Sequence, residues 1–576
     1  MKRPEFGKWI RPGWVLLAGM LAWGGLSCGP DHTTSVMKTG SQTNWLRLCE
    51  SNAECGDLEC VCGVCSSKCE SDTQCADLAG ASCIAASDPG TVAVCGGKPP
   101  PSSLCLTRCE EESGRNGEHC TAGVLTPAPE PDVRVSVNPD VRYQTLVGVG
   151  ASLAYAEDEI ATHPRREALF DVMFSDSGFE AVRFRNRYAS EDDDDLQPTR
   201  SILDAAEQRL GGRPVLFMTS ATPPAELKAN ESRGCTGDPD TCTLRLAPGG
   251  GFDYASLATY WSASLDAHAE AGIVPDYVSI QNDPDWVPDA STFAEACRFL
   301  PEEGEMVVPR DGRPMQVAYP GYREALAAVR DAFAALPNAP ALVAPETTGI
   351  ELVSEYVEPL EPASYDALAY HLYGTEIDSI DPAAFERVRD IGERSGLPIF
   401  QTEMRADGLT TAVLIHHSMT TAGASVYLQN DFAASASAPE GDPHALIALT
   451  SEGFETQGPY HALRHYARYT ERGWVRVEAG LDAPSGGANA DDATALLSSA
   501  WLSTDGTELT LVLVNPGTET LDVLLELPPA LLAEAASSVV ERTVFEGVER
   551  SAPLGPLPTD GIVSLPAGAV LTVSLR

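Results

Sequence analysis

Three short polar clusters in the sequence each follow directly after an apolar run. In chain order they contain Asn282 and Asp283 in "QNDPDW" (281–286), His371 and Tyr373 in "AYHLYG" (369–374), and Glu403 in "IFQTEM" (399–404). Two carboxyl groups on separate runs can divide a reaction between them. One must be protonated to donate to a leaving group, and the other must be ionised to attack the reacting atom. The clusters therefore predict paired-carboxylate chemistry shared between Asp283 and Glu403.

Hydrolysis of a glycosidic bond needs such a pair, in environments that push the two pKa values apart. Asn282, next to Asp283, suits a hydrogen bond to a sugar 2-hydroxyl, a contact that strengthens in the transition state. A single carboxylate after a strand is often only a solvated loop residue, so no cluster carries the prediction alone. Together, an amide, an imidazole, a phenol and two carboxylates favour a site that cleaves sugars.

The elements that must bring these clusters together are short apolar strands alternating with amphipathic helical stretches, from about residue 132 to 473. Eight runs are expected to be strands: 145–150, 180–185, 214–220, 276–282, 341–346, 367–373, 398–404 and 424–430. This alternation predicts a (β/α)8 TIM barrel, in which residues that follow the strands meet at one face. A doubly wound open sheet is the structural alternative, but no glycine-rich nucleotide fingerprint follows the first strand.

The pattern changes again near residue 474, beyond which strand-like runs are separated by turns. Such a pattern predicts a β-sandwich over 474–576. The segment "DVRVSVNP" (132–139) could add a strand to it. The predicted fold class is therefore α/β: a catalytic barrel over 132–473 whose first strand is shared with a side-attached C-terminal sandwich, preceded by a small disulfide-rich module.

Cysteines concentrate near the N-terminus, where 12 of the 16 lie between Cys49 and Cys120. A dense, even set in an exported chain predicts a disulfide-rich module over 49–123, which a Pro-rich linker over 124–131 would follow. Zinc is the alternative, since "CVCGVC" resembles a ligand cluster, although the module contains a single histidine. Further along, Cys235 and Cys242 bracket a loop and are expected to pair, which leaves Cys297 as a buried thiol.

The first residues resemble an export signal. Basic residues precede an apolar run from Trp14 to Leu26 that is too short to favour a membrane-spanning helix. The following "GGLSCG" resembles a bacterial lipoprotein signal, which predicts a signal peptide over 1–28, lipidation of Cys28 and a polar tether over 29–48. Secretion without a lipid is the alternative. Either way we expect the mature chain outside the cytoplasm, at a membrane only through a lipid anchor.

Charge and metal-binding motifs narrow the possible partners. Lys and Arg number 39 against 83 Asp and Glu, for a formal net charge of −44, which argues against nucleic acid as a partner. The acidic run "SEDDDDLQP" (190–198) lacks EF-hand spacing and is expected to be a solvated loop, with calcium binding as the alternative. The predicted reaction needs no metal and no cofactor.

Several motifs resemble those of glycoside hydrolase family 30, a family of retaining (β/α)8 glycosidases. The resemblance spans about 132–576 and rests on "YQTLVGVGASLAYA" (143–156), "FEAVRFRNRY" (179–188), "SATPPAELKAN" (220–230), "SIQNDPDW…EACRFLPEE" (279–303), "YHLYG" and "FQTEM". It implies that Glu403 is the nucleophile and that Asp283 stands at the acid/base position. It also implies that Asn282, His371, Tyr373, Arg183, Trp286 and Tyr155 bind the substrate, with His371 and Tyr373 orienting Glu403. Packing at the barrel rim is the alternative for Trp286 and Tyr155.

Asp283 departs from the family, which has glutamate at this position. Aspartate is one methylene shorter, so its carboxyl stands roughly 1.5 Å further back. Three interpretations follow: the backbone lies closer and Asp283 still serves as the acid, Asp285 replaces it, or the protein binds glycan at the cell surface with little or no catalysis.

The motifs resemble the xylanase branch of the family most closely. Members of that branch that require glucuronate use an arginine after the eighth strand, but residues 427–446 contain neither Arg nor Lys. A neutral xylan-type β-1,4-glycan is therefore the expected substrate. Glucosylceramide and β-1,6-glucan, substrates elsewhere in the family, are the alternatives. The sequence does not distinguish endo from exo cleavage.

Overall fold

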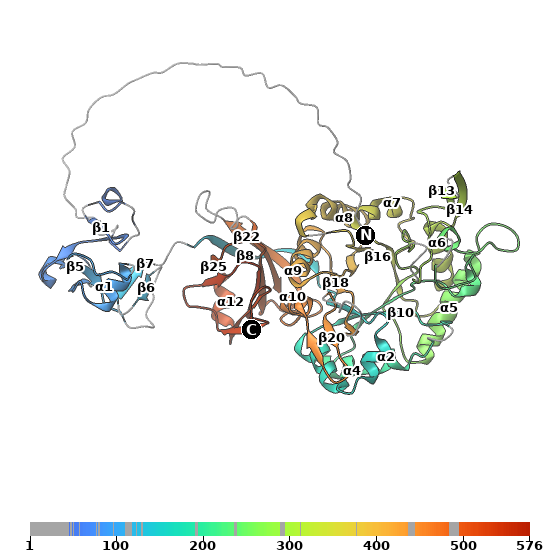
Figure 1. Ribbon diagram of the computed structural model, residues 1–576, viewed down its shortest axis with the longest axis horizontal. Helices are drawn as coiled ribbons and strands as arrows, with labels where there is room; N and C mark the ends of the chain where they lie inside the picture. Colours follow the sequence, from blue (N-terminus) through green and yellow to red (C-terminus); the bar gives the residue numbers. More distant parts are fainter. Residues whose placement is uncertain are drawn as a thin grey trace, which may run out of the picture. The chain divides into compact units, whose positions relative to one another are not determined.

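The computed structural model describes most of the chain after residue 44 (Figure 1). It describes residues 45–127 and 131–576 except 47–48, 50, 57, 77, 79–80, 96, 110–117, 122–123, 191–193, 236–238, 289–293, 311–312, 376, 436–443 and 483–494. The predicted signal peptide over 1–28, with Cys28, lies outside the described residues, as do most of the tether and part of the acidic run. The chain forms two compact units, Met1–Ala128 and Pro129–Arg576.

The large unit contains the predicted barrel, a closed ring of eight parallel strands. In ring order these are β9 (Gly148–Ser152), β10 (Ala181–Arg185), β11 (Val215–Thr219), β12 (Tyr277–Ser279), β15 (Ala341–Thr347), β16 (Ala367–His371), β17 (Ile399–Glu403) and β18 (Val426–Gln429). Their side chains are buried on both faces, as expected of a covered parallel sheet. Apolar residues from several strands, such as Phe217 and Phe400, fill the interior as one cluster. The barrel is therefore a packed scaffold that can hold a site rigidly at its rim.

Helices cover the outside of the barrel (Figure 1). They are α2 (Glu157–Thr162), α3 (Arg166–Phe170), α4 (Gln197–Leu210), α5 (Tyr254–Glu270), α6 (Tyr322–Phe333), α7 (Val353–Val357), α8 (Pro382–Ser395), α9 (Gly408–His416) and α10 (Gly458–Ala467). One apolar face of each long helix packs on the strands, as in α6, where Leu326, Val329 and Phe333 are buried. Asp253 and Asp381 cap α5 and α8 by accepting bonds from backbone N–H groups.

Gly150 in β9 permits the barrel to close. A Cβ atom at this position would lie 1.8 Å from the carbonyl oxygen of Ala181 in the neighbouring strand β10. Only a residue without a side chain allows the two backbones to approach this closely. The glycine-rich run "GVG" is therefore a packing requirement of the first barrel strand.

The C-terminal region is a nine-stranded sheet that folds over on itself. Its order is β27 (Ala552–Gly555), β26 (Ser538–Val544), β29 (Ala569–Leu575), β24 (Leu509–Asn515), β23 (Leu497–Leu502), β22 (Val475–Asp482), β8 (Val133–Thr145), β25 (Leu521–Glu526) and β28 (Ile562–Leu565), with the short helix α12 (Pro529–Glu534). Residues from both ends of this order, such as Val523 and Val540, share one apolar cluster. The predicted sandwich, including its strand from before the barrel, is confirmed.

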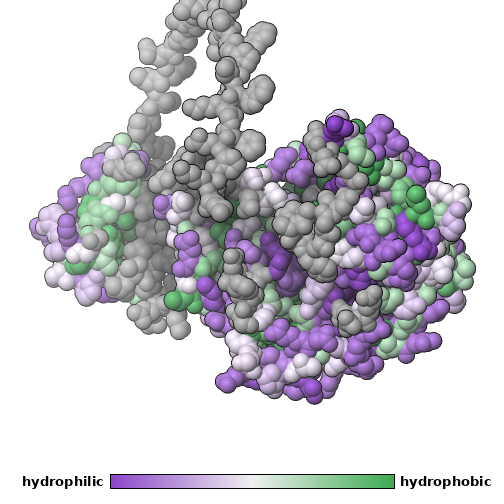
Figure 2. Space-filling model, turned by 45° about the vertical axis from the view of Figure 1, so that its right-hand side comes forward, coloured by the Kyte–Doolittle hydropathy of each residue, from purple (hydrophilic) through white to green (hydrophobic). Residues whose placement is uncertain are grey.

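Two smaller groups of strands extend from the barrel. A hairpin of β13 (Gly304–Arg310) and β14 (Arg313–Tyr319) follows β12, and the three-stranded group β19 (Ala433–Ser435), β20 (Ile447–Leu449) and β21 (Phe454–Thr456) follows β18. On the face that Figure 2 shows, hydrophilic residues cover most of the visible surface and hydrophobic residues are scattered among them.

The small unit is stapled by disulfides, as predicted. Its elements are β1 (Glu59–Val61), β2 (Val64–Ser66), β3 (Lys68–Cys69), β4 (Ala81–Ile84), α1 (Pro89–Val94), β5 (Ser103–Thr107), β6 (Glu118–Thr121) and β7 (Val124–Pro127). Disulfides join Cys49–Cys60, Cys55–Cys65, Cys62–Cys95, Cys69–Cys83 and Cys75–Cys105, and Cys109 is disulfide-bonded as well. Dense disulfides fit an exported protein. Among the described residues, no helix is long and apolar enough to cross a membrane.

One predicted boundary of the small unit is wrong. The sequence places a Pro-rich linker over 124–131, but residues 124–127 form strand β7, which pairs with β6. Proline is tolerated in an edge strand, so Pro127 does not exclude a strand there. The disulfide-rich unit therefore continues beyond residue 123.

Candidate active site

The sequence-predicted clusters meet in one cavity of about 740 Å³ at the carboxyl ends of the barrel strands. Asn282 and Asp283 follow β12, Tyr373 follows β16, and Glu403 is the last residue of β17. All four line this cavity. Because parallel strands of a barrel end at the same face, residues more than a hundred positions apart in the chain are brought together.

Glu403 lies in a set of hydrogen-bond donors. Arg183 Nη1 donates to its Oε2 at 2.5 Å, Tyr373 Oη donates to Oε1 at 2.7 Å, and Asn430 Nδ2 donates to Oε1 at 3.1 Å. Burial raises the pKa of Glu403, but the charges of Arg183 and His371 and these hydrogen bonds outweigh it and leave that pKa below its ordinary value. Glu403 is therefore ionised, as a nucleophile must be.

Asp283 lies in a different environment. Its Oδ1 is 2.7 Å from His371 Nδ1, and its Oδ2 accepts a 2.6 Å bond from Asn282 Nδ2. Burial raises the pKa of Asp283 and exceeds the opposing effect of His371. Its backbone has a φ of 46°, in the left-handed region that non-glycine residues rarely adopt.

The two carboxyl groups are close enough to act on one bond. An oxygen of Asp283, a ring nitrogen of His371 and an oxygen of Glu403 all lie within 4.8 Å of one another. Opposite pKa shifts on neighbouring carboxyl groups are the signature of an acid paired with a nucleophile. The same three groups could also converge on a cation, but Arg183 already places a positive charge at Glu403.

Two sequence-based expectations need correction. The sequence predicts that His371 lines the substrate site and orients Glu403, but His371 is fully buried, and its Nδ1 contacts Asp283 instead. Tyr373 alone of that pair contacts Glu403. Asp285, the alternative acid, does not line the cavity, and its Oδ1 accepts a 2.9 Å bond from the backbone N–H of Thr348. Asp285 therefore fixes a loop and is not aimed at the cavity.

The two aromatic candidates, Tyr155 and Trp286, both line the cavity and are 61% and 38% exposed. The Tyr155 ring lies 4.0 Å from the Arg185 guanidinium, and its hydroxyl donates to Glu295 Oε2 at 3.1 Å. These contacts hold the ring in place while it remains exposed to solvent, as a platform for a sugar ring requires.

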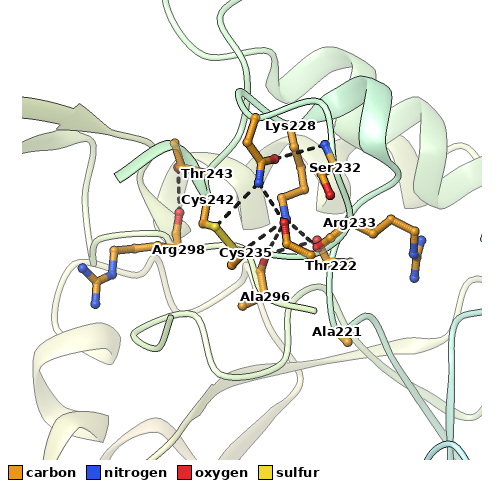
Figure 3. Close-up of a disulfide and its surroundings, with 12 residues drawn as sticks. Ala221, Thr222, Lys228, Ser232, Arg233, Cys235, Cys242, Thr243, Ala296 and Arg298 are labelled. Carbon is orange, nitrogen blue, oxygen red and sulfur yellow. Dashed lines mark hydrogen bonds between the residues drawn. A yellow bond between two sulfur atoms is a disulfide. The ribbon is translucent and has the colours of Figure 1, made fainter. Parts of the chain in front are cut away.

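A buried lysine, Lys228, supports the wall of the cavity that Glu295 lines. Figure 3 shows Lys228 beside Arg233, Ala296 and the Cys235–Cys242 disulfide. Lys228 Nζ donates 2.7 Å bonds to the carbonyl oxygens of Arg233 and Ala296. The first carbonyl lies two residues before Cys235, which is joined to Cys242 by a disulfide. The second adjoins Glu295, which pairs with Arg233 at 2.9 Å. Lys228 thus ties together the segments that carry this wall. Cys297 is a buried free thiol.

Sequence reasoning missed several groups of the site. They are Glu346 below the cavity and Arg185, Glu295, Arg405, Asn430 and Asp431 on its lining. Burial raises the pKa of Asp431 to about 6 despite the neighbouring Arg405. The signal for Glu346 was available, since "ALVAPE" ends in a carboxylate like the other clusters. Arg185 ends strand β10. The other groups lie in loops, where residue type alone does not distinguish a cavity wall from solvated surface.

No model of a known protein family matches the sequence, and no curated protein sequence matches it. Solved structures do resemble it. A glycoside hydrolase family 30 subfamily 8 xylanase from Clostridium acetobutylicum is 20% identical, with 77% of this chain and 100% of the xylanase covered at a TM-score of 0.56. The catalytic domain of a family 30 xylanase C from Talaromyces cellulolyticus gives 16% identity, the same coverages and a TM-score of 0.56. An endo-β-1,6-glucanase gives 14% identity, 78% and 96% coverage and a TM-score of 0.54. At these identities the likeness establishes the fold, a (β/α)8 barrel with an attached β-sandwich.

Proposed function

We propose that this chain is a retaining glycoside hydrolase of the family 30 type that cleaves a xylan-type β-1,4-glycan. The observation that carries the proposal is the pairing of Asp283 with Glu403: their nearest oxygens lie within 4.8 Å, and their environments shift their pKa values in opposite directions. This closeness supports the carboxyl separation of about 5–5.5 Å used by retaining enzymes over the 6.5–9.5 Å of inverting ones.

In the first step, Glu403 attacks the anomeric carbon while Asp283 gives its proton to the departing glycosidic oxygen. The bond from the anomeric carbon to that oxygen breaks, and a glycosyl ester forms on Glu403. Tyr373 and Asn430 both contact Glu403 Oε1, while Arg183 contacts Oε2. These donors fix the carboxylate in one orientation for attack.

In the second step, Asp283 acts as the base. It takes a proton from a water molecule, whose oxygen attacks the anomeric carbon and displaces Glu403. The sugar is released with its original configuration, and Asp283 is protonated again. Asn282, which touches both Arg183 and Asp283, is placed to contact the sugar between the two carboxyl groups.

The charges of the cavity support a neutral substrate. Arg405 lies on the lining but forms a 2.9 Å ion pair with Asp431, so its charge is balanced within the protein. The xylanases among the structural neighbours support a xylan-type backbone, and the exposed rings of Tyr155 and Trp286 supply apolar faces for pyranose rings.

The disulfide-rich unit supports function outside the cytoplasm. We propose that residues 1–28 direct export, that Cys28 carries the lipid anchor, and that the tether over 29–48 and the small unit hold the barrel at the cell envelope.

A glycan-binding protein without turnover is the second candidate, and the aspartate at position 283 favours it. A displacement of about 1 Å in a catalytic group can cost roughly 10²-fold in rate. The two candidates share the cavity and differ only in whether bonds break.

The deciding experiment is product analysis. The protein and its Glu403→Gln variant are incubated with unsubstituted xylan, glucuronoxylan and β-1,6-glucan, and released sugars are separated and their anomeric configuration is followed by NMR. We expect β-configured oligosaccharides from xylan with the unmutated protein and a loss of at least about 10³-fold with Glu403→Gln. Products of inverted configuration would contradict the retaining mechanism. Retention on a xylan column with no product from either protein would identify the binding protein instead.

A further inference from the structure

A third buried carboxylate, Glu346, lies beneath the acid and the nucleophile. It is near the end of β15, is 1% exposed and does not line the cavity. Its backbone has a φ of 57°, in the left-handed region. Buried carboxylates are rare unless they are paired, and strained backbone at such a position indicates a requirement of the surrounding structure.

Glu346 is bound to the groups that hold the catalytic pair. Its Oε2 accepts from Arg183 Nη2 at 3.2 Å and from Thr219 Oγ1 at 3.0 Å. Its Oε1 lies 3.8 Å from Nε2 of His371, the ring whose Nδ1 contacts Asp283. Its own carbonyl oxygen accepts a 3.2 Å bond from the backbone N–H of Asp283. His371 therefore lies between two carboxylates, one that faces the cavity and one that does not.

The charges in this cluster balance only if protons are present. Glu346, Glu403 and Asp283 can carry three negative charges, against the single permanent positive charge of Arg183. The charged and titratable groups that face His371 and Asp283 are Glu346 from β15, Glu403 from β17, and Asp285 and Tyr373 from the loops after β12 and β16. A cationic His371 and a protonated Asp283 would bring the sum for Arg183, His371, Asp283, Glu346 and Glu403 to zero.

We propose that Glu346 is a positioning residue that holds His371 as an imidazolium and thereby keeps a donated N–H on Asp283 throughout the reaction. This inference rests on the proposed function of the site. When Asp283 gives its proton to the leaving oxygen, it becomes a carboxylate beside the imidazolium, which stabilises it until it takes a proton from water. His371 keeps both of its protons in each step, so only Asp283 exchanges a proton with the substrate.

The electrostatic environment supports this arrangement. Burial lowers the pKa of His371. The charge of Asp283 once it has given up its proton, the charge of Glu403, and the contacts with Asp283 and Glu346 outweigh burial and raise that pKa to about 10. Burial raises the pKa of Glu346, but the charge of Arg183 and the contact with His371 hold it well below its ordinary value. Glu346 is therefore a permanent negative charge, which a neutral glutamine of the same shape would remove.

The test follows the charge of His371 directly. Imidazole nitrogen signals are recorded by NMR between pH 5 and 9 for the intact protein and for Glu346→Gln, and His371→Gln identifies the signal among the ten histidines. We expect His371 to remain doubly protonated over this range in the unmutated protein. In Glu346→Gln we expect it to lose a proton within the range. An identical titration in both proteins would overturn the inference.

Two further variants separate charge from structure. Glu346→Asp keeps the negative charge and should keep His371 cationic, which makes the test possible even if the glutamine variant does not fold. Glu541→Gln removes an equally buried carboxylate in the sandwich, where it pairs with Arg464. This control should lower stability and leave the titration of His371 unchanged. Loss of the imidazolium in Glu346→Asp or in Glu541→Gln would show that the charge of Glu346 is not its cause.

Kinetics supply the second readout. The alkaline limb of kcat/KM reports loss of the proton from the Asp283–His371 pair. Removing a nearby negative charge weakens proton binding, so Glu346→Gln should shift this limb to lower pH by about one unit or more. A profile lowered at every pH without a shift would contradict the proposal. If the unmutated protein cleaves no glycan, the proposed function fails, while the NMR titration still decides the role of Glu346.

Discussion

At the scale of single residues, the aspartate at position 283 is the feature that most needs explanation. Its side chain is one methylene shorter than glutamate, yet its carboxyl group lies close to that of Glu403. The backbone of Asp283 is in the left-handed region and is bonded to the carbonyl of Glu346. This local conformation, together with His371 and Asn282, aims the short side chain into the cavity. The loss of one methylene therefore does not by itself exclude Asp283 as the proposed acid.

The first prediction concerns Asp283→Asn. The asparagine cannot donate a proton, so cleavage of substrates with poor leaving groups should fall about 10²–10⁴-fold. Aryl glycosides with good leaving groups need no acid in the first step and should show little loss in that step. Measuring the first-step rate across leaving groups of different basicity tests this dependence.

Asp431→Asn is the matched control, because Asp431 also lines the cavity and has a pKa raised to about 6. If Asp283 is the acid, the rates of Asp431→Asn should not depend more steeply on the leaving group than those of the unmutated protein. If the rates of Asp431→Asn depended steeply on the leaving group and those of Asp283→Asn did not, Asp431 would be the acid instead.

The sequence was sufficient to find site residues that are polar and follow an apolar strand. It was not sufficient to find those whose role depends on the side chains that they contact in the folded protein. Asp283 and Glu403 stand directly after apolar strands, where polar groups must meet at the barrel rim. The contact of His371 with Asp283 could not be predicted, because it depends on which way the ring points from the end of β16. Glu346 was missed because a carboxylate after a strand is more often solvated, and only the geometry shows it buried against Arg183 and His371.

At the scale of elements, alternation of strands and helices was sufficient to predict the barrel. Most barrel strands are apolar and short, and most are followed by a helical segment, a pattern that few folds share. The hairpin β13–β14 was not predicted, because its side chains are largely exposed and carry no regular apolar pattern. Strand β7 was read as linker for a related reason: disulfides supply the stability that apolar side chains supply elsewhere.

Among the elements around the cavity, we expect the wall held by Lys228 to be the most sensitive to substitution. Lys228 is the only lysine between residues 99 and 576. Lys228→Met would leave the carbonyl of Arg233 without its side-chain donor, while the carbonyl of Ala296 would keep a 3.2 Å bond from Thr222 Oγ1. A buried unpaired group costs about 1–3 kcal/mol, so we expect the free energy of unfolding to fall by about 1–3 kcal/mol. KM should rise more than kcat falls, because the wall carries Glu295 and not the reacting groups.

The same variant has a signature in pH. Burial lowers the pKa of Lys228 from its ordinary 10.5 to about 8. Between these values the unfolded chain holds a proton that the native protein has released, so the contribution of Lys228 to stability rises with pH over that window. Urea denaturation at pH 7, 9 and 10.5 should therefore show that the free energy of unfolding of the unmutated protein increases relative to that of Lys228→Met as pH rises.

The control for Lys228→Met is Arg134→Met, which removes an exposed cation paired with Glu526 at 3.5 Å. It should change stability by less than about 1 kcal/mol. A difference between Lys228→Met and the unmutated protein that stays constant with pH would contradict the assignment of a lowered pKa to Lys228.

At the scale of the whole molecule, the barrel and the sandwich form one unit, and the disulfide-rich module forms another. Arg464 on α10 pairs with Asp176 at 3.1 Å on the barrel side and with Glu541 of β26 in the sandwich. Such partly buried charge networks across an interface are costly to break, because one partner would be left buried and unpaired. We therefore expect the barrel and sandwich to unfold together.

The prediction at this scale is that a chain beginning at residue 129 keeps the stability and activity of the large unit. Its melting temperature should differ from that of the same transition in the full chain by less than about 2 °C. Its kcat/KM on soluble xylo-oligosaccharides should be unchanged. Calorimetry and oligosaccharide kinetics check both expectations.

A chain beginning at residue 147 is the comparison. It removes β8, an interior strand of the sandwich sheet that pairs with both β22 and β25. We expect this chain to be unfolded or aggregated. A marked loss of stability on removal of residues 1–128 alone would show that the module is part of the folded large unit.

The position of β8 in the sheet also determines the order in which the strands of the sandwich can assemble. Asp132 and Asp522 are joined by hydrogen bonds although 390 positions separate them. A chain that emerges N-terminus first, from a ribosome or from a membrane pore, presents β8 long before its partner β25 exists. Both edges of β8 therefore remain unpaired while the whole barrel emerges. The sandwich can close only after β29, which lies between β24 and β26, has emerged. A stalled or truncated chain therefore exposes an unpaired strand edge that chaperones or proteases can recognise.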